Sequence, residues 1–176
     1  MKGIVFFVIS VALIVFFGCG KDQVAQGLAL PPITDTGANT FGCKINGNIW
    51  TPYHEIGFPL PLSSDYGYDR FSFMKIFSIN ARNGRMFQKS WIELSVGNVK
   101  DTGIYFINNT SIPVSMTYYD EVKDYNSYGA DNYVRFTRFD TIKKIFSGTF
   151  LFSVRSDTSG NPNTKFRITE GQFDVH

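Results

Sequence analysis

Cys19 is the residue whose chemistry is best defined by its surroundings. It follows one positive charge at Lys2, an apolar run over residues 4–17 and the small residue Gly18. This order is typical of a bacterial lipoprotein signal peptide, which is cleaved before a cysteine whose thiol carries a diacylglyceryl group. The run of 14 residues is short for a membrane-spanning helix, which needs about 20. We therefore expect a lipidated Cys19 and a signal peptide over residues 1–18.

Two acyl chains hold a protein stably on a bilayer where one does not. A lipid on Cys19 predicts a protein of the cell envelope, anchored on the outer membrane, with the membrane as its first partner. Phe16 and Phe17 stand where leucine and a small residue usually precede the cysteine. An ordinary secretory signal cut nearby, or an uncleaved anchor, are the alternatives.

Tyrosines in and beside two predicted loops, over residues 64–69 and 118–133, are the candidate ligand-binding residues. Exposed aromatic side chains stack on sugars and anchor protein interfaces. These residues predict a surface for a glycan or a protein partner. The alternative is ordinary strand packing, in which tyrosine is common. The candidates are Tyr66, Tyr68, Tyr118, Tyr119, Tyr125 and Tyr128.

Catalytic and metal-binding patterns are weak in this chain. The only histidines are His54 and His176, and no Gly-x-Ser-x-Gly motif occurs. With Cys19 acylated, Cys43 has no disulfide partner and is expected to be a buried apolar residue. The acidic loop over residues 120–131 resembles a calcium loop only in part. Counted from Asp124, Tyr128 stands at the fifth position and Arg135 at the twelfth, where a bidentate Glu is needed. We predict no enzyme, no cofactor and no metal site, with weak Ca²⁺ binding by this loop as the open alternative.

The charge balance excludes partners that require a strongly basic protein. The chain has 17 Lys and Arg residues and 15 Asp and Glu residues. Loss of Lys2 with the signal peptide leaves the mature protein nearly neutral. Nucleic-acid binding needs a basic patch or stripe, so we expect no nucleic-acid partner.

Strand and turn patterns fill the chain from Phe41 onward. Asn46-Gly47 and Asn83-Gly84 are typical of hairpin turns, because Asn and Gly tolerate positive φ. Apolar and polar residues alternate over 71–82 and 91–97, which predicts a long hairpin with Phe71 and Phe73 on its core face. Further strands are predicted over 103–107, 114–119, 132–139 and 144–155. Two last strands, at 166–168 and 173–175, are expected to meet in a tight turn at Gly171.

About nine or ten short strands without a helix predict an all-β protein, a single antiparallel β-sandwich. A lipocalin-like barrel is the alternative fold. Residues 19–40 are rich in Pro and turn-forming residues and predict a flexible tether. The all-β domain is expected over residues 41–176.

Three segments resemble small lipoproteins of the Bacteroidota whose domain has no assigned function. They are LPPITDTGANTFGCKINGNIWTP (Leu30 to Pro52), KIFSGTFLFSV (Lys144 to Val154) and ITEGQFDVH (Ile168 to His176). The resemblance brackets the mature domain and implies a secreted, lipid-anchored β-domain. It implies no catalytic or ligand-binding residues.

Together these patterns predict a lipid-anchored envelope protein with a non-enzymatic binding or structural role. A glycan-binding surface module is one specific form of this prediction. A lipocalin-like carrier of a small apolar ligand is the alternative, and it requires an internal cavity of several hundred Å³.

Overall fold

The computed structural model describes residues 29–53, 60–85, 89–107, 113–156 and 165–176. These residues form eleven strands, and the described part contains no helix long and apolar enough to cross a membrane. The prediction of an all-β antiparallel fold is confirmed. The strands are β1 (Thr40–Ile45), β2 (Asn48–Trp50), β3 (Leu62–Asp69), β4 (Met74–Asn83), β5 (Ser90–Gly97), β6 (Gly103–Phe106), β7 (Val114–Tyr119), β8 (Asp124–Ser127), β9 (Tyr133–Asp140), β10 (Ile145–Arg155) and β11 (Lys165–Val175).

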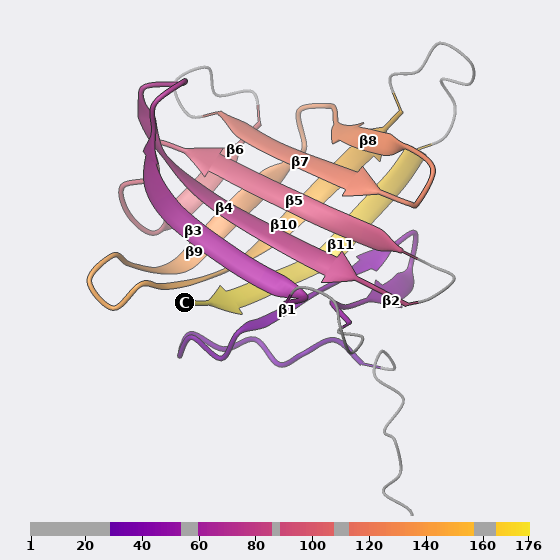
Figure 1. The fold of residues 1–176 in the computed structure, drawn as a ribbon, viewed down its shortest axis with the longest axis horizontal. Helices are drawn as coiled ribbons and strands as arrows, with labels where there is room; N and C mark the ends of the chain where they lie inside the picture. Colours follow the sequence, from indigo (N-terminus) through magenta and orange to yellow (C-terminus); the bar gives the residue numbers. More distant parts are fainter. Residues whose placement is uncertain (1–28, 54–59, 86–88, 108–112, 157–164) are drawn as a thin grey trace, which may run out of the picture.

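The strands belong to one hydrogen-bonded sheet with the order β2-β1-β11-β10-β8-β7-β5-β4-β3. β10 pairs with β9 along its first seven residues and with β8 at its last two, so the sheet divides there, and β6 extends the β9 branch. The sheet curls into a half-barrel in which β3, β4, β5 and β7 lie across β9, β10 and β11 (Figure 1). It therefore combines the two facing layers of a sandwich with the continuous sheet of a barrel.

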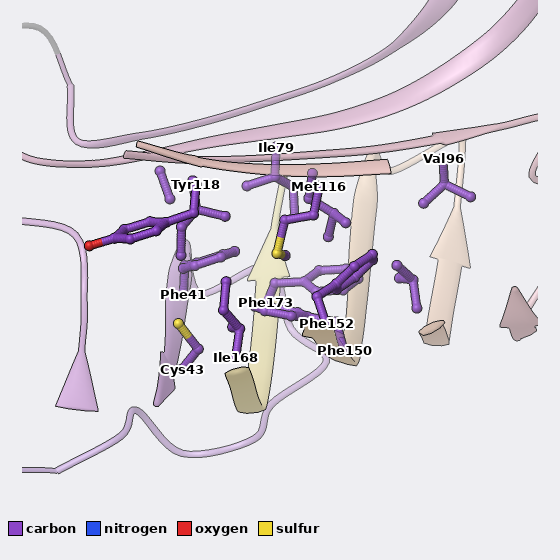
Figure 2. Packing of buried hydrophobic residues seen from close by; sticks show 14 of the residues in the cluster. Phe41, Cys43, Ile79, Val96, Met116, Tyr118, Phe150, Phe152, Ile168 and Phe173 are labelled. Atoms are coloured by element: carbon purple, nitrogen blue, oxygen red, sulfur yellow. The ribbon is translucent and has the colours of Figure 1, made fainter. Parts of the chain in front are cut away.

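Aromatic rings fill the space between the two layers. Phe77 of β4 is fully buried, and its ring centroid lies 5.1 Å from that of Phe136, 5.1 Å from that of Phe146 and 5.8 Å from that of Phe173. Figure 2 shows Met116 of the first layer above the rings of the second. Contacts at this spacing are those of a close-packed core. This packing favours the predicted sandwich interior over that of a ligand-carrying barrel.

The first hairpin forms as predicted. Asn46 and Gly47 join β1 to β2 with φ values of 49° and 85°, and Ile45 pairs with Asn48. Positive φ at both turn residues is the geometry that Asn-Gly favours. The hairpin places Trp50 against the other layer, where its indole N–H donates a hydrogen bond of 2.9 Å to the hydroxyl of Ser90.

The last strand differs from the prediction of two strands joined by a turn at Gly171. β11 is continuous from Lys165 to Val175 and pairs with both β1 and β10. A bulge at Thr169 and Glu170, where Glu170 has a φ of 50°, shifts the inward side chains from even to odd positions. One extra residue in a strand produces this change of phase. Both predicted segments are strand, and the tight turn predicted between them at Gly171 is wrong, because the chain continues through the bulge.

The predicted hairpin of residues 71–97 also needs a correction. β4 begins at Met74, and residues 70–73 form a turn that joins it to β3. Phe71 and Phe73, expected in the core, are 95% and 78% exposed. The strands β3 and β8 were not predicted, because they are rich in Ser, Asp, Asn and Tyr and lack an apolar alternation.

The C-terminal part of the predicted tether, from Leu30 onward, is docked on the sheet. The carboxylate of Asp174, a side chain that is 1% exposed, accepts six hydrogen bonds, which we call the Asp174 clasp. The predicted tether of residues 19–40 is therefore too long at its C-terminal end, and residues 19–28 lie outside the described residues. The donors are the hydroxyl and N–H of Thr36, the N–H groups of Gly37 and Ala38, and the hydroxyls of Thr34 and Ser147.

Further contacts fix the same segment along β1 and β11. The Gln172 side chain donates to the carbonyl of Pro31, and the N–H of His176 donates to Asn39 over 3.2 Å. A Cβ on Gly42 would lie 2.6 Å from Pro31 Cδ, so glycine is needed for this close approach. The segment is thus part of the folded domain, which begins about ten residues earlier than the sequence indicates.

Candidate functional site

Two of the six candidate tyrosines belong to the core. Tyr118 and Tyr125 are 8% and 4% exposed, and both pack edge-on against Phe166. Burial, together with the charge of Asp120, raises the pKa of Tyr118 to about 12. Burial and a hydrogen bond of 2.8 Å to Asp120 raise the pKa of Tyr125 to about 12. These side chains stabilise the fold and are not available to a ligand.

Tyr119 and Tyr128 lie on other parts of the surface. Tyr119 of β7 stacks on Trp91 of β5 with ring centroids 3.7 Å apart, so each ring covers a face of the other. Tyr128, just after β8, lies beside the cationic groups of Arg155 and Lys165, at 5.1 and 5.7 Å from its centroid. Both residues are separated from β3 by intervening strands of the sheet. The structure therefore does not bring the predicted tyrosines together into one surface.

Tyr66 and Tyr68 of β3 do share a site. They line a surface hollow of about 540 Å³ between the β3–β4 turn, the segment after β5 and the β9–β10 turn. We call this hollow the Tyr66 groove. Figure 1 shows these three connections at one end of the half-barrel. The residues that matter for its chemistry are Tyr66, Tyr68, Phe73, Lys75, Lys100 and Thr141.

Tyr66 forms the fixed floor of the groove. Its hydroxyl donates a hydrogen bond of 3.2 Å to the carbonyl of Val99, and its ring meets the ring of Phe139 edge-on at 5.1 Å. Burial, assisted by Tyr105, raises the pKa of Tyr66, so the phenol stays neutral. The side chain is held from both layers and is preorganised for contact with a ligand.

Tyr68 and Phe73 form the exposed rim. They are 60% and 78% exposed. Phe73 has a φ of 57°, which is unusual for a bulky residue and is maintained only where neighbouring contacts enforce it. Here Asp69 accepts hydrogen bonds from the N–H groups of Phe71 and Ser72 and from the Ser72 hydroxyl. These bonds, the Ser72 hydroxyl first, lower the pKa of Asp69 and keep it charged.

Lysines supply the charge of the groove. Lys75 Nζ lies 5.6 Å from the centroid of the Tyr66 ring, in a cation–π contact. Lys100 also lines the groove and is exposed. Apolar ring faces beside hydrogen-bond donors suit a carbohydrate, whose C–H faces stack on aromatic rings while its hydroxyls are bound by polar groups.

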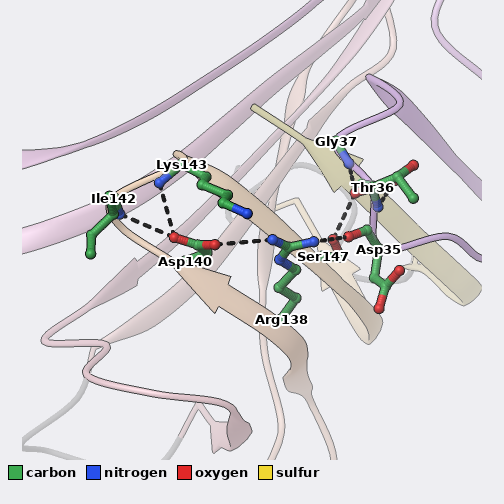
Figure 3. A network of polar contacts seen from close by, with 9 residues as sticks. Asp35, Thr36, Gly37, Arg138, Asp140, Ile142, Lys143 and Ser147 are labelled. Atoms are coloured by element: carbon green, nitrogen blue, oxygen red, sulfur yellow. Dashed lines mark hydrogen bonds and ion pairs between the residues drawn. The ribbon is translucent and has the colours of Figure 1, made fainter.

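A polar network links the groove to the N-terminal segment. Arg138 donates a hydrogen bond of 2.6 Å to the carbonyl of Asp35 and forms an ion pair of 3.0 Å with Asp140 (Figure 3). Asp140 in turn accepts hydrogen bonds from the N–H groups of Ile142 and Lys143, at 3.2 and 2.9 Å. These bonds, with that of Lys143 first, lower the pKa of Asp140. The docked segment and the β9–β10 turn are thus held by one side chain.

The remaining candidates show no catalytic arrangement within the described residues. Cys43 is fully buried in the core, and burial raises the pKa of its thiol, which disfavours the nucleophilic thiolate. His54 lies outside the described residues, and His176 Nδ1 lies 3.0 Å from the carbonyl of Gly37. In the described ranges no three His, Cys, Asp or Glu side chains are placed to hold a metal. In the loop of residues 120–131, Asp120 accepts hydrogen bonds from Val122 and Lys123 within its own turn.

The sequence pattern does not identify the rim residue Phe73 or the exposed Ile142, because it predicts Phe73 on a core face and leaves Ile142 between two predicted strands. Asp69 and Asp140 are the signals that could have found them, since an aspartate that opens a turn bonds the backbone two residues on. Comparison with known proteins gave no match to a family model, to a curated protein or to a solved structure.

Proposed function

We propose that this protein is a non-enzymatic binding module of the cell envelope that is anchored by a lipid on Cys19 and binds a glycan in the Tyr66 groove. The observation that carries the binding role is the groove itself, with a fixed tyrosine floor and two exposed aromatic rings at its rim. Exposure of an aromatic ring face to water is unfavourable, and stacking of a sugar on that face is favourable because it removes the face from water.

The anchoring part of the proposal is supported by the signal pattern before Cys19 and by the resemblance to small Bacteroidota lipoproteins. It places the protein on the outer membrane. Carriage of a small apolar ligand is less well supported, because rings at contact distance fill the interior between the two layers.

Cys19→Ala is expected to abolish incorporation of labelled palmitate and to release the protein from the envelope fraction, because the acyl chains would be its membrane anchor. The measurement is metabolic labelling followed by fractionation. Cys43→Ala is the matched control, since it removes the other thiol of the chain, which is buried in the core. Label retained on the Cys19 variant, or lost equally from both variants, contradicts the proposal.

Tyr68→Ala is expected to weaken glycan binding about tenfold, because truncation of an aromatic anchor commonly costs more than 1 kcal/mol of binding free energy. The glycan is first identified on an array with the purified protein, and its affinity is then measured by titration calorimetry. Tyr128→Ala is the control, since it removes a tyrosine outside the groove. Tyr125 is unsuitable as a control because it is a core residue.

Two outcomes contradict the glycan proposal. One is the absence of any bound glycan across arrays that include acidic polysaccharides. The other is an equal loss of affinity in the Tyr68 and Tyr128 variants when both remain folded by circular dichroism, since binding would then not depend on the groove.

A further inference from the structure

Two turns at the groove end of the molecule are built in the same way. In the β3–β4 turn, Asp69 accepts hydrogen bonds from the backbone N–H groups of the second and third residues after it. Asp140 does the same in the β9–β10 turn. Each turn ends with a residue at positive φ, Phe73 at 57° and Lys144 at 54°. In both turns the residue two positions after the aspartate, Phe71 or Ile142, projects into solvent.

Large apolar side chains occupy these two positions. Phe71 is 95% exposed and Ile142 is 93% exposed, and Phe73, in the same turn as Phe71, is 78% exposed. Both turns border the Tyr66 groove, which Phe73 and Thr141 line. Large apolar side chains this exposed, on two turns that border one hollow, make this end of the molecule a candidate interaction surface.

Positive charge is in excess over the segments that carry or adjoin these apolar residues. The segments 69–75, 98–102 and 140–144, which we call the tip, contain five cationic residues and three aspartates. All three aspartates accept backbone hydrogen bonds in the tip. None of the five cations forms an ion pair with another described residue. They are Arg70, Lys75, Lys100, Lys143 and Lys144.

A third turn of similar build provides a comparison. Asp120 accepts hydrogen bonds from the N–H groups of Val122 and Lys123, and Val122 is 77% exposed. This β7–β8 turn lies at the other end of the half-barrel (Figure 1). Its neighbours include Glu121 and Asp124. An exposed apolar residue therefore accompanies this kind of turn. Among the connections that the structure describes, only the tip combines two such turns with an excess of positive charge.

We propose that the tip docks on an anionic phospholipid bilayer, with Phe71 and Ile142 inserted at the boundary between headgroups and acyl chains and the five cations against the lipid phosphates. Apolar side chains surrounded by Lys and Arg are what such a surface binds. A second copy of the chain fits less well, since two tips facing each other bring together charges of the same sign. The docked tip would fix the orientation of the domain and bring the Tyr66 groove to the membrane surface.

The proposed docking places Phe71 and Ile142 in the bilayer, and neither residue lines the Tyr66 groove, although the tip shares Phe73, Lys75 and Lys100 with it. The docking needs no glycan, and comparison of two positions in the same protein separates it from an anchor at Cys19.

A depth-sensitive fluorescence experiment tests the docking. The full-length protein as isolated from the envelope, with Phe71→Trp, is combined with vesicles of phosphatidylethanolamine and phosphatidylglycerol that carry brominated acyl chains. Val122→Trp is the matched control, since it changes an exposed residue at the corresponding position of a turn at the other end. Trp50 and Trp91 add the same background to both.

The tryptophan at position 71 is expected to be quenched at least twofold more than the one at position 122. Two changes are each expected to remove this difference in quenching. One is charge reversal by Arg70→Glu and Lys143→Glu in the same protein. The other is replacement of the anionic lipid by phosphatidylcholine. Thermal unfolding verifies that every variant is folded. Equal quenching at the two positions overturns the proposal. Quenching at position 71 that is the same with anionic and with zwitterionic vesicles also overturns it. So does protection of that position from a soluble quencher in the absence of vesicles, which would indicate a protein neighbour.

Discussion

Asp174→Asn is expected to lower the free energy of unfolding by about 2–3 kcal/mol, because it replaces one acceptor oxygen of the buried carboxylate by a group that cannot accept the N–H bonded to it. Oδ1 accepts the N–H of Gly37, and Oδ2 accepts the N–H groups of Thr36 and Ala38. An asparagine NH₂ in place of either oxygen therefore faces at least one backbone donor. The measurement is urea unfolding at neutral pH, with hydrogen exchange of the 36–38 amides as a local readout of segment release.

Glu170→Gln is the matched control on the same strand. Glu170 pairs with Lys44 over 2.7 Å, but its side chain is 57% exposed. Exposed ion pairs contribute about 0–1 kcal/mol, so this variant is expected to remain close to the native stability. If Asp174→Asn and Glu170→Gln lose similar unfolding free energy, the clasp does not hold the segment. The same follows if the amides of residues 36–38 stay protected from hydrogen exchange in Asp174→Asn.

The contribution of Asp174 also predicts a pH dependence. Burial alone would raise the pKa of this carboxyl, but the hydrogen bonds from Ser147, Thr34, Ala38 and Gly37 together hold it well below its usual range. An unfolded aspartate has a pKa of about 3.9. As the pH falls through this value, the unfolded chain takes up a proton that the folded protein does not, and stability is lost. The difference in unfolding free energy between the native protein and Asp174→Asn is therefore expected to be largest above about pH 5 and to decrease below about pH 4.

Gly171→Ala is expected to cost about 3 kcal/mol or more of unfolding free energy, at the upper end of overpacking effects. A Cβ at this position would lie 2.3 Å from two atoms of the Phe150 ring. That ring is 1% exposed and stacks on Phe41 at 5.2 Å, so it has no space into which to move. The expected loss is measured by urea unfolding of the purified protein.

Gly84→Ala serves as the control, since the added Cβ would meet its nearest atom at an ordinary 3.7 Å. Phe150→Leu in the Gly171→Ala background tests the cause. The smaller side chain removes the clash, so the double variant is expected to lose less stability than the sum of the single variants. Additive losses in the double variant would mean that Phe150 is not the obstacle to a side chain at position 171.

Local patterns predicted the strands that bury an apolar face. Ile92, Leu94 and Val96 alternate in β5, and all three are fully buried. Asn46-Gly47 predicted the first hairpin because its turn geometry depends only on those two residues. β3 was not predicted because it has no apolar face of its own. Its polar residues are held in an extended conformation by hydrogen bonds to β4.

Features that depend on distant partners could not be read from the sequence. Thr34 and Asp174 are 140 residues apart, and nothing near Thr34 indicates a buried carboxylate that would bind it. The Tyr66 groove is also assembled from three separate connections of the sheet. Individual tyrosines were identified correctly as candidates, but whether each faces solvent or the core depends on strand register, which a one-residue change reverses. Cys19 lies outside the described residues, and its lipid remains a prediction.

The position of β11 has a consequence for how the protein is made. This strand lies between β1 and β10 and provides the clasp carboxylate, yet it leaves the ribosome after the other ten strands. Until it arrives, β1 has no neighbour except the three-residue β2, and the cradle for residues 34–38 does not exist. Contacts across such long sequence separations form slowly. The β1–β2 hairpin and residues 34–38 are therefore expected to join the sheet only after the whole chain has left the ribosome.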